Sequence, residues 1–296
     1  MPTYFPQINA NGVITQNPYK TVQSFNSIVQ DMPFGRGFST SQRGSGLNNF
    51  PTGPLSSFAV GYTSITDAEV ATLSTFFDST KGSLGSFIFL DPDGNLVNNS
   101  EDFTQTSWTS QNSGVTVTTN GGLADPFGGT RASLLTATTS NSNYAPIVVA
   151  AGQLPNNFVL CGSLYAMAMA ANQTLSLGFV DSGFSVLGNG VSSLPQNVWT
   201  RIYFAMQINS SSYIRLLIGG FGTWNSSAIR IFGPQCTPSM GPGSYSKSPE
   251  NYGYHANCRF DTDNFNVTKI GPNQNSLALP VAEFFSGTNT ITGETF

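Results

Sequence analysis

The sequence TDAEVATLSTFFDSTKGSLGSFIFLDPDG, residues 66–94, predicts a helix, a buried strand and a sharp turn in direct succession. Its first four residues fit a capping box, in which the Thr66 hydroxyl accepts from a backbone N–H and Glu69 bonds back to the start of the helix. Apolar residues at helical spacing, among them Phe76 and Phe77, then line one face. The sequence therefore predicts a helix that buries an aromatic pair.

A glycine, an apolar strand and a turn follow this helix. Gly82 is a suitable terminator, because glycine readily adopts the left-handed conformation that commonly ends a helix. The apolar run SFIFL around Phe87 is typical of a buried strand, and the sequence DPDG, which starts with Asp91 and Pro92, favours a tight turn. This is the one helix that the sequence indicates clearly.

The composition of the whole chain indicates a β-rich protein. Of the 296 residues, 23 are Phe, 31 are Gly and 17 are Pro, a combination that favours short strands and many turns. Charged residues make up 9%, against about 25% in typical soluble domains, so uncharged polar residues must cover much of the surface. The hydrophobic content of 39% is sufficient for a folded core.

Charge and hydropathy argue against two classes of partner. The net charge is −4, and the 11 Lys and Arg residues form no basic run of the kind that nucleic acids or anionic membrane surfaces require. The longest apolar run, residues 159–171, is too short to span a bilayer. We therefore expect no nucleic acid partner and no membrane insertion.

The middle and the end of the chain carry further strand signals. Between residues 95 and 235, short apolar runs are separated by Gly, Asn and Pro, which is typical of an all-β sandwich or jelly roll. Residues 236–257 are rich in Pro and Gly and are expected to form a connecting loop. Strand signals resume at Arg259, and the alternating Asp261 and Asp263 would share one face of that strand as interface or turn partners of Arg259.

The cysteine content gives no sign of a disulfide framework. Cys161, Cys236 and Cys258 are odd in number and widely separated. Free thiols are the simplest interpretation, with a Cys236–Cys258 disulfide as the alternative.

The first part of the chain resembles a known family. The helix with Phe76 and Phe77, the glycine, the strand with Phe87 and the turn at Asp91 and Pro92 resemble the distal tail proteins of long-tailed phages and gene-transfer particles. In that family a helix ending in paired aromatic residues is followed by the same succession of glycine, strand and turn. The resemblance gives these five residues a motif-carrying structural role.

The end of the chain resembles the closing segment of the same family. The sequence RFDTD, which holds Arg259, Asp261 and Asp263, is followed by the apolar and acidic residues VAE at positions 281–283. Two motifs of one family in the right order are more specific than either alone.

The middle of the chain resembles a second family. The sequence NNSEDF before Trp108 resembles the opening of carbohydrate-binding-like modules that are common in phage tail proteins. The same modules carry a strand similar to the one around Trp199, and they end with a sequence similar to RIFGPQ, which includes Gly233 and Gln235. The acidic residue that usually follows this glutamine is Cys236 here.

Together the two resemblances imply a mainly β fold class: a split β-barrel or β-sandwich outer domain with one helix, interrupted by a jelly-roll β-sandwich insertion. The outer, distal-tail-like domain takes residues 1–94 and 245–296, the carbohydrate-binding-like insertion takes residues 95–235, and residues 236–257 connect them. A surface turn such as that at residues 91–94 tolerates an insertion because its ends lie close together.

The resemblance to distal tail proteins implies a structural virion protein of the tail tip, assembled in the host cytoplasm. Such a protein would form a homo-hexameric ring closed by head-to-tail interfaces. It would join the tail tube protein to the tail hub and fibre proteins, and the inserted sandwich could bind a host cell-surface glycan.

The alternative is a peripheral carbohydrate-binding receptor protein, an adhesin of the tail. Trp108 and Trp199 occupy signature positions of the module and are expected in its core. Trp224 lies in the glycine-rich sequence GGFGTWN, so Trp224 and Asn225 are the candidate glycan contact. An adaptor should form a stable ring, whereas an adhesin should lose cell attachment, but not assembly, when the sandwich is removed.

The sequence carries no enzyme signature. The single histidine, His255, lies three residues before Cys258, but two residues at a spacing without a known signature do not make a catalytic dyad. Asp91 and Asp93 are better explained by a turn than by calcium or paired-carboxylate chemistry. No zinc spacing, P-loop or dinucleotide fingerprint occurs, so we expect no catalytic site, no metal site and no cofactor.

Overall fold

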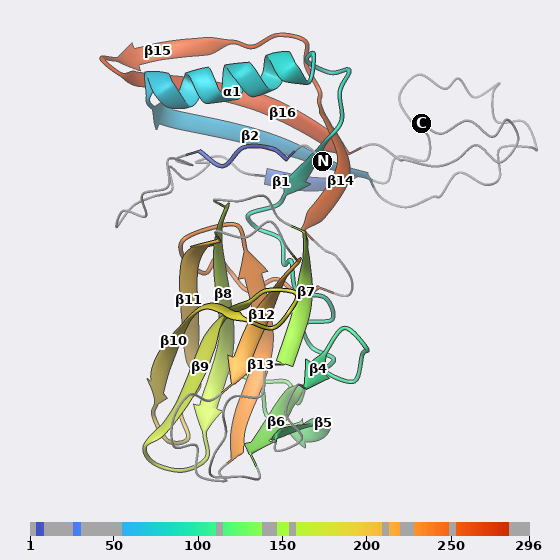
Figure 1. The fold of residues 1–296 in the computed structure, drawn as a ribbon, viewed down its shortest axis with the longest axis vertical. Coiled ribbons are helices and arrows are strands. Elements are labelled where there is room, and N and C mark those ends of the chain that lie inside the picture. The colour runs from blue at the N-terminus through green and yellow to red at the C-terminus, as the bar shows by residue number, and fades with distance from the viewer. Residues whose placement is uncertain are drawn as a thin grey trace, which may run out of the picture. The chain divides into compact units, whose positions relative to one another are not determined.

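The computed structural model describes residues 4–8, 26–30, 55–110, 115–137, 147–153, 158–208, 213–219, 228–248 and 253–283. The chain divides into two compact units (Figure 1). Unit 1 comprises Met1–Asn9, Tyr19–Phe89 and His255–Phe296, and unit 2 comprises Ala10–Pro18 and Leu90–Tyr254.

The helix of unit 1, α1 (Asp67–Ser79), begins at the predicted capping box. The Thr66 hydroxyl accepts from the Glu69 N–H at 3.2 Å, and the Glu69 carboxylate accepts from the Thr66 N–H at 2.7 Å. After the helix, Lys81 and Gly82 adopt the left-handed conformation with φ of 55° and 61°, and the Gly82 N–H donates to a carbonyl of the last helical turn at 3.0 Å. The capping box and the glycine terminator are thus both confirmed.

One sheet in unit 1 joins the two ends of the chain. Its strands are β1 (Asn26–Gln30), β2 (Leu55–Ile65), β3 (Phe87–Leu90), β14 (Tyr254–Phe260), β15 (Val267–Gly271) and β16 (Gln274–Glu283). They are ordered β1-β2-β16-β14-β3, with β15 paired to β16, and α1 runs along the sheet beside β2 and β16 (Figure 1). The described strands of this unit form an open sheet with β1 and β3 at its ends, so they do not close into the barrel that was one of the two expected forms.

Four phenylalanine rings form the centre of the unit 1 core. We call Phe5, Phe76, Phe87 and Phe260 the aromatic quartet, because each ring centroid lies 4.9–6.1 Å from the other three. The quartet connects the N-terminal residues, α1, β3 and β14. Both segments that carry the distal-tail-like motif therefore contribute to one core.

The described strands of unit 2 form two five-stranded antiparallel sheets. The first is ordered β10-β9-β12-β7-β4 and the second β11-β8-β13-β6-β5. The strands of the first sheet are β4 (Thr109–Ser110), β7 (Ile147–Gln153), β9 (Gln173–Val180), β10 (Val186–Leu194) and β12 (Tyr213–Gly219). Those of the second are β5 (Val115–Leu123), β6 (Ala132–Ala137), β8 (Phe158–Ala168), β11 (Thr200–Ile208) and β13 (Ala228–Thr237).

The two sheets of unit 2 pack face to face. A Cβ atom added at Gly162 on β8 would lie 2.3 Å from Leu216 Cδ1 on β12, so the facing leucine occupies the space above this glycine. At one edge of the sandwich, a Cβ at Gly190 on β10 would lie 3.0 Å from the Phe204 ring on β11. The mainly β fold class with one helix and a β-sandwich is thereby confirmed.

The end of β14 differs from the prediction. The strand stops at Phe260, and Asp261 and Asp263 lie in the bend that follows it, so the prediction that they share a strand face is wrong. The physical reason is that the Asp263 carboxylate accepts from the Ser83 N–H at 3.2 Å and from its hydroxyl at 2.5 Å, which ties this bend to the end of α1. The partner of Asp263 is therefore Ser83 and not Arg259.

All three cysteines are buried free thiols, so the alternative Cys236–Cys258 disulfide is not formed. Burial raises the pKa of Cys161 to about 12 and also raises the pKa of Cys236 and of Cys258. These thiols are protonated at neutral pH, which makes them poor nucleophiles.

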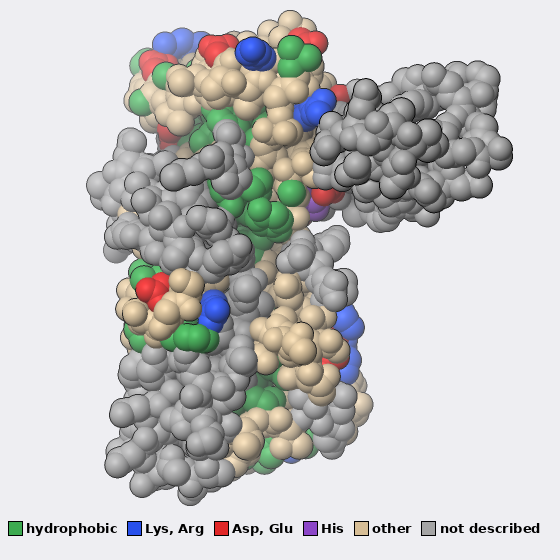
Figure 2. Space-filling model, turned by 45° about the vertical axis from the view of Figure 1, so that its right-hand side comes forward, with side chains coloured by type: hydrophobic (Ala, Val, Ile, Leu, Met, Phe, Trp, Pro, Cys, Tyr) green, Lys and Arg blue, Asp and Glu red, His purple; other side chains and the backbone are tan. Residues whose placement is uncertain are grey.

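The surface of unit 1 agrees with the low charge content. Figure 2 shows its Lys, Arg, Asp and Glu side chains scattered singly among backbone and uncharged polar atoms. No helix in the described part of the chain is long and apolar enough to cross a bilayer.

Candidate functional site

Charged and aromatic side chains meet in an open hollow on unit 2. The hollow has a volume of about 630 Å³, which lies within the range of small-ligand sites. It is lined by Glu101, Phe127, Arg131, Tyr165, Arg201, Ser244, Tyr245 and Lys247. These residues come from segments far apart in the sequence, so the fold brings them together.

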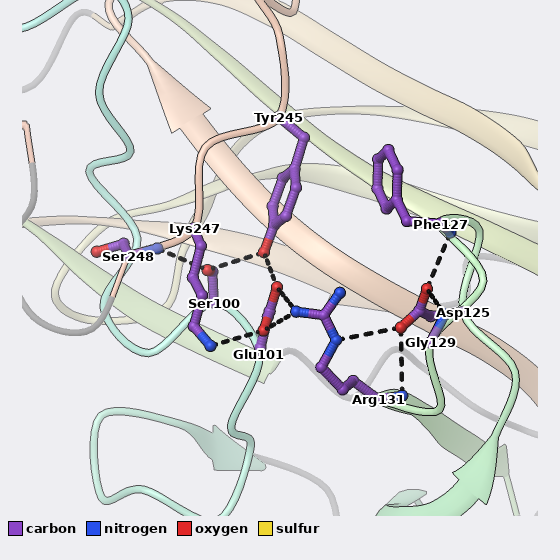
Figure 3. A network of polar contacts seen from close by, with 9 residues as sticks. All are labelled: Ser100, Glu101, Asp125, Phe127, Gly129, Arg131, Tyr245, Lys247 and Ser248. Carbon is purple, nitrogen blue, oxygen red and sulfur yellow. Dashed lines mark hydrogen bonds and ion pairs between the residues drawn. The ribbon is translucent and has the colours of Figure 1, made fainter.

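A buried carboxylate organises the turn that carries two of the lining residues. The Asp125 side chain is 0% exposed, and its Oδ1 accepts from the N–H groups of Phe127 and Gly129 at 2.9 and 3.0 Å. Its Oδ2 accepts from the backbone N–H and from Nε of Arg131 at 3.4 and 3.2 Å (Figure 3). A Cβ at Gly129 would lie 2.4 Å from this oxygen, so the turn requires glycine there. Asp125 thus fixes both Phe127 and Arg131.

The ionisation of Asp125 depends on these bonds. Burial alone would raise the pKa of Asp125, but hydrogen bonds from the backbone N–H groups of Phe127, Gly129 and Arg131, together with the Arg131 side chain, outweigh it. The pKa of Asp125 therefore lies below its ordinary value, and the turn contains a carboxylate at neutral pH.

Glu101 is the second buried carboxylate and joins three segments. Its side chain is 6% exposed, and its two oxygens accept from Arg131 Nη1 at 2.9 and 2.8 Å. Lys247 Nζ lies 2.9 Å from Oε2, and the Tyr245 hydroxyl donates to Oε1 at 3.1 Å (Figure 3). Burial in the first place, and the adjacent Glu101 carboxylate, raise the pKa of Tyr245, so its hydroxyl is a neutral donor.

Backbone contacts hold the loop after β13 in place beside Glu101. The Ser100 N–H donates to the Ser248 carbonyl, and the Ser248 N–H donates to the Ser100 hydroxyl, both at 3.0 Å. Asn95 Nδ2 donates to the carbonyls of Pro234 and Ser246 at 3.1 and 2.9 Å. The stretch expected only as a connecting loop therefore supplies part of the hollow.

An aromatic cluster forms the apolar part of the hollow. The Phe127 side chain is 57% exposed and stacks on Tyr245, with ring centroids 5.9 Å apart and an interplanar angle of 21°. It also meets Tyr165 and Phe232 edge-on at 5.3 and 5.9 Å. Gly233 has φ of +58°, and a Cβ there would lie 2.7 Å from the Tyr245 ring. Glycine at this motif position therefore makes room for one wall of the hollow.

Arg201 and Gln235 line or adjoin the hollow and position its loop through hydrogen bonds. Arg201 Nη2 donates to the Ser163 hydroxyl at 3.1 Å and to Gln235 Oε1 at 2.8 Å, and its guanidinium lies 5.4 Å from the Tyr165 ring centroid. Gln235 Nε2 donates to the Ser244 carbonyl at 3.1 Å. The motif glutamine thus has a positioning role at the hollow.

Trp108 and Trp199, which were expected in the core, do not line the hollow. Trp108 is buried, donates through Nε1 to the Asn99 carbonyl at 3.0 Å, and packs on Phe103 with centroids 4.5 Å apart. Trp199 is half-buried and directly precedes β11. Trp224 and Asn225 lie outside the described residues, so their contact with a glycan stays a prediction.

The single histidine of the chain pairs with a carboxylate of unit 1. His255 Nδ1 lies 2.9 Å from a Glu283 carboxylate oxygen, and its ring packs on Phe58 at 4.8 Å. In the parts of the chain that the structure describes, no three His, Cys, Asp or Glu side chains are grouped so that they could hold a metal ion.

No family model and no curated protein matches the sequence. Solved structures that resemble part of the chain include the enzymatically active domain of bacteriophage CBA120 tailspike protein 4, at 17% identity and a TM-score of 0.37, over 48% of this chain and 21% of that chain. Another is the CBM22-1 xylan-binding domain of Paenibacillus barcinonensis Xyn10C, at 16% identity and a TM-score of 0.38, over 52% of this chain and 99% of that domain. The tandem CBM22-1-CBM22-2 domain of the same Xyn10C matches at 18% identity and a TM-score of 0.37, over 64% and 61%.

Proposed function

We propose that unit 2 binds carbohydrate through the hollow around Phe127 and Arg131. The observation that carries this proposal is an exposed aromatic ring set beside fixed charged and hydroxyl groups. A pyranose has an apolar face that can pack on such a ring, and a rim of hydroxyl groups that can bond to neighbouring polar side chains. The role is binding, without a catalytic step.

The rigidity of the hollow supports this function. Asp125 accepts four hydrogen bonds, from Phe127, Gly129 and Arg131. Glu101 holds Arg131, Tyr245 and Lys247 from a nearly buried position. Because these groups are fixed before a ligand arrives, binding needs little further ordering of side chains.

The test compares two exposed aromatic residues. Phe127 and Tyr203 are each 57% exposed, but only Phe127 lines the hollow. A glycan array with the whole chain identifies a ligand, and calorimetry then measures its affinity for Phe127→Ala and Tyr203→Ala. We expect Phe127→Ala to bind about tenfold more weakly or worse, a loss of about 1.4 kcal/mol, because it loses the stacking surface.

Tyr203→Ala should bind like the unsubstituted chain. Equal affinities for both variants would show that the sugar does not contact Phe127. If no glycan binds to the chain, the proposed carbohydrate-binding function is wrong.

A second proposal concerns unit 1. We propose that it is the ring-forming adaptor part of a distal-tail-like protein at the virion tail tip, joining the tail tube to hub and fibre proteins. The aromatic quartet favours this assignment, since it brings Phe76 and Phe87 of the first motif onto Phe260 of the closing motif.

The mass of the whole protein in solution, measured by native mass spectrometry across a range of concentrations, tests the adaptor role. A closed ring near six subunits would support it. A monomer at all concentrations would count against a self-sufficient ring and favour the peripheral adhesin, whose hollow would act at the cell surface.

A further inference from the structure

The open side of the hollow presents donors that the protein itself does not use. Arg131 donates through Nε to Asp125 and through Nη1 to Glu101. Within the described residues, its Nη2 has no hydrogen-bond partner. Figure 3 shows Nη2 as the guanidinium nitrogen without a dashed line. The Arg131 side chain is 47% exposed, so this nitrogen belongs to a group that a ligand can reach.

Lys247 adds a second cation at the same place. Its side chain is 60% exposed, and its Nζ contacts Glu101 Oε2, the oxygen that Arg131 Nη1 also contacts. The two cationic groups therefore lie side by side. An ammonium group has three donors, and this contact occupies one of them.

The charge of the hollow opposes that of the chain. Three cations, Arg131, Arg201 and Lys247, line it against the single carboxylate of Glu101, and the buried Asp125 still leaves one positive charge in excess. The chain as a whole has a net charge of −4 and only 11 Lys and Arg residues. A local positive excess in a concave site attracts anions.

We propose that the sugar bound in the hollow is acidic and carries one anionic group, a carboxylate or a phosphate, that accepts from Arg131 Nη2 and Lys247 Nζ while its ring packs on Phe127. This inference rests on the proposed carbohydrate-binding function. A neutral sugar would offer only uncharged acceptors to Arg131 Nη2 and to the remaining N–H groups of Lys247 Nζ, whereas an anionic group makes charge-assisted hydrogen bonds with both.

The experiment uses the whole chain and a panel of acidic oligosaccharides, each paired with its neutral counterpart. Uronic acid oligosaccharides are compared with their carboxyl-reduced forms, and phosphorylated oligosaccharides with their dephosphorylated forms. We expect the acidic member of at least one pair to bind tenfold or more tightly (about 1.4 kcal/mol), with the preference shrinking as salt is added. The pair that shows the preference identifies the anionic group.

A matched pair of lysine variants tests the contact directly. Lys247→Gln should weaken binding of the acidic sugar at least fivefold more than it weakens binding of the neutral counterpart. Lys269→Gln removes the same charge from an equally exposed side chain of unit 1, whose partner is Asp67 at 3.6 Å, and should have no effect.

Two other outcomes separate this inference from the function on which it rests. Equal affinity for the acidic and neutral members of every pair would overturn the inference and leave carbohydrate binding intact. Absence of binding to any glycan would overturn both.

Discussion

Phe260→Ala is expected to lower the free energy of unfolding of unit 1 by about 3–5 kcal/mol. Phe260 is 1% exposed, and its ring packs on the other three members of the aromatic quartet and on Phe77 at 4.9 Å. The cavity left by its removal would have walls from the N-terminal residues, α1 and β3. These walls cannot all move inward together, so the cavity should persist. The whole expected loss in the free energy of unfolding should therefore be measured.

Equilibrium denaturation measures this loss, and amide hydrogen exchange locates it. Amides of β14 and β16 should lose protection, because Phe260 lies on β14 and β14 pairs with β16. Phe260→Leu should cost less, roughly 1–1.5 kcal/mol, because much of the volume is kept. Phe127→Ala, at a ring that is 57% exposed, should change stability little. A loss below about 1 kcal/mol for Phe260→Ala would contradict the central role of the quartet.

Asp125→Ala is expected to lower the free energy of unfolding by about 3 kcal/mol or more, since bonds to a charged group contribute roughly 1.5–3 kcal/mol each. The substitution removes the acceptor for the N–H groups of Phe127 and Gly129 and for Arg131 Nε. Binding of glycan should fall at the same time, because the turn that fixes Phe127 and Arg131 is lost. Denaturation and calorimetry on one protein sample measure both effects.

Asp102→Ala is the matched control. Asp102 also accepts hydrogen bonds from neighbours, Thr104 and Gln105, but these bonds are exposed to solvent, so its removal should change stability and binding little. Similar losses for the two variants would show that burial of Asp125 does not matter.

Because of Asp125, the free energy of unfolding should decrease as the pH falls through the acidic range. The pKa of Asp125 in the folded protein lies below its ordinary value. Its contribution is therefore complete above the unfolded pKa of about 4 and is lost as the pH falls below that value. Between about pH 5 and pH 2 the unsubstituted chain should lose more stability than Asp125→Ala, and parallel curves for the two would contradict this assignment.

Local sequence signals were enough to predict α1 and the strand and turn after it. Thr66, Glu69 and Gly82 act through bonds to residues within one or two turns of the helix, so their role can be read without the rest of the fold. Asp263 shows the limit of such reading. Its partner Ser83 is 180 positions away, so the alternating residue pattern showed no sign of this bond or of the bend after Phe260.

The hollow could not be predicted in the same way. The sequence ADPFGGTR, residues 124–131, has the composition of a turn, but nothing in it shows that Phe127 is exposed. Glu101 and Lys247 are separated by nearly the whole of unit 2 and meet only because Ser100 and Ser248 pair across it. By contrast, the signature position of Trp108 predicted a place in the core, and its ring is buried with Nε1 bonded to a backbone carbonyl inside the unit.

The burial of all three cysteines has a practical consequence for labelling. Cys161, Cys236 and Cys258 are at most 1% exposed, and each thiol has a raised pKa, so maleimide reagents should leave the folded chain unmodified. A cysteine introduced at an exposed position would then be the single reactive handle. Fluorescent probes or tethers for single-molecule work can therefore be attached without removing any native thiol from the core.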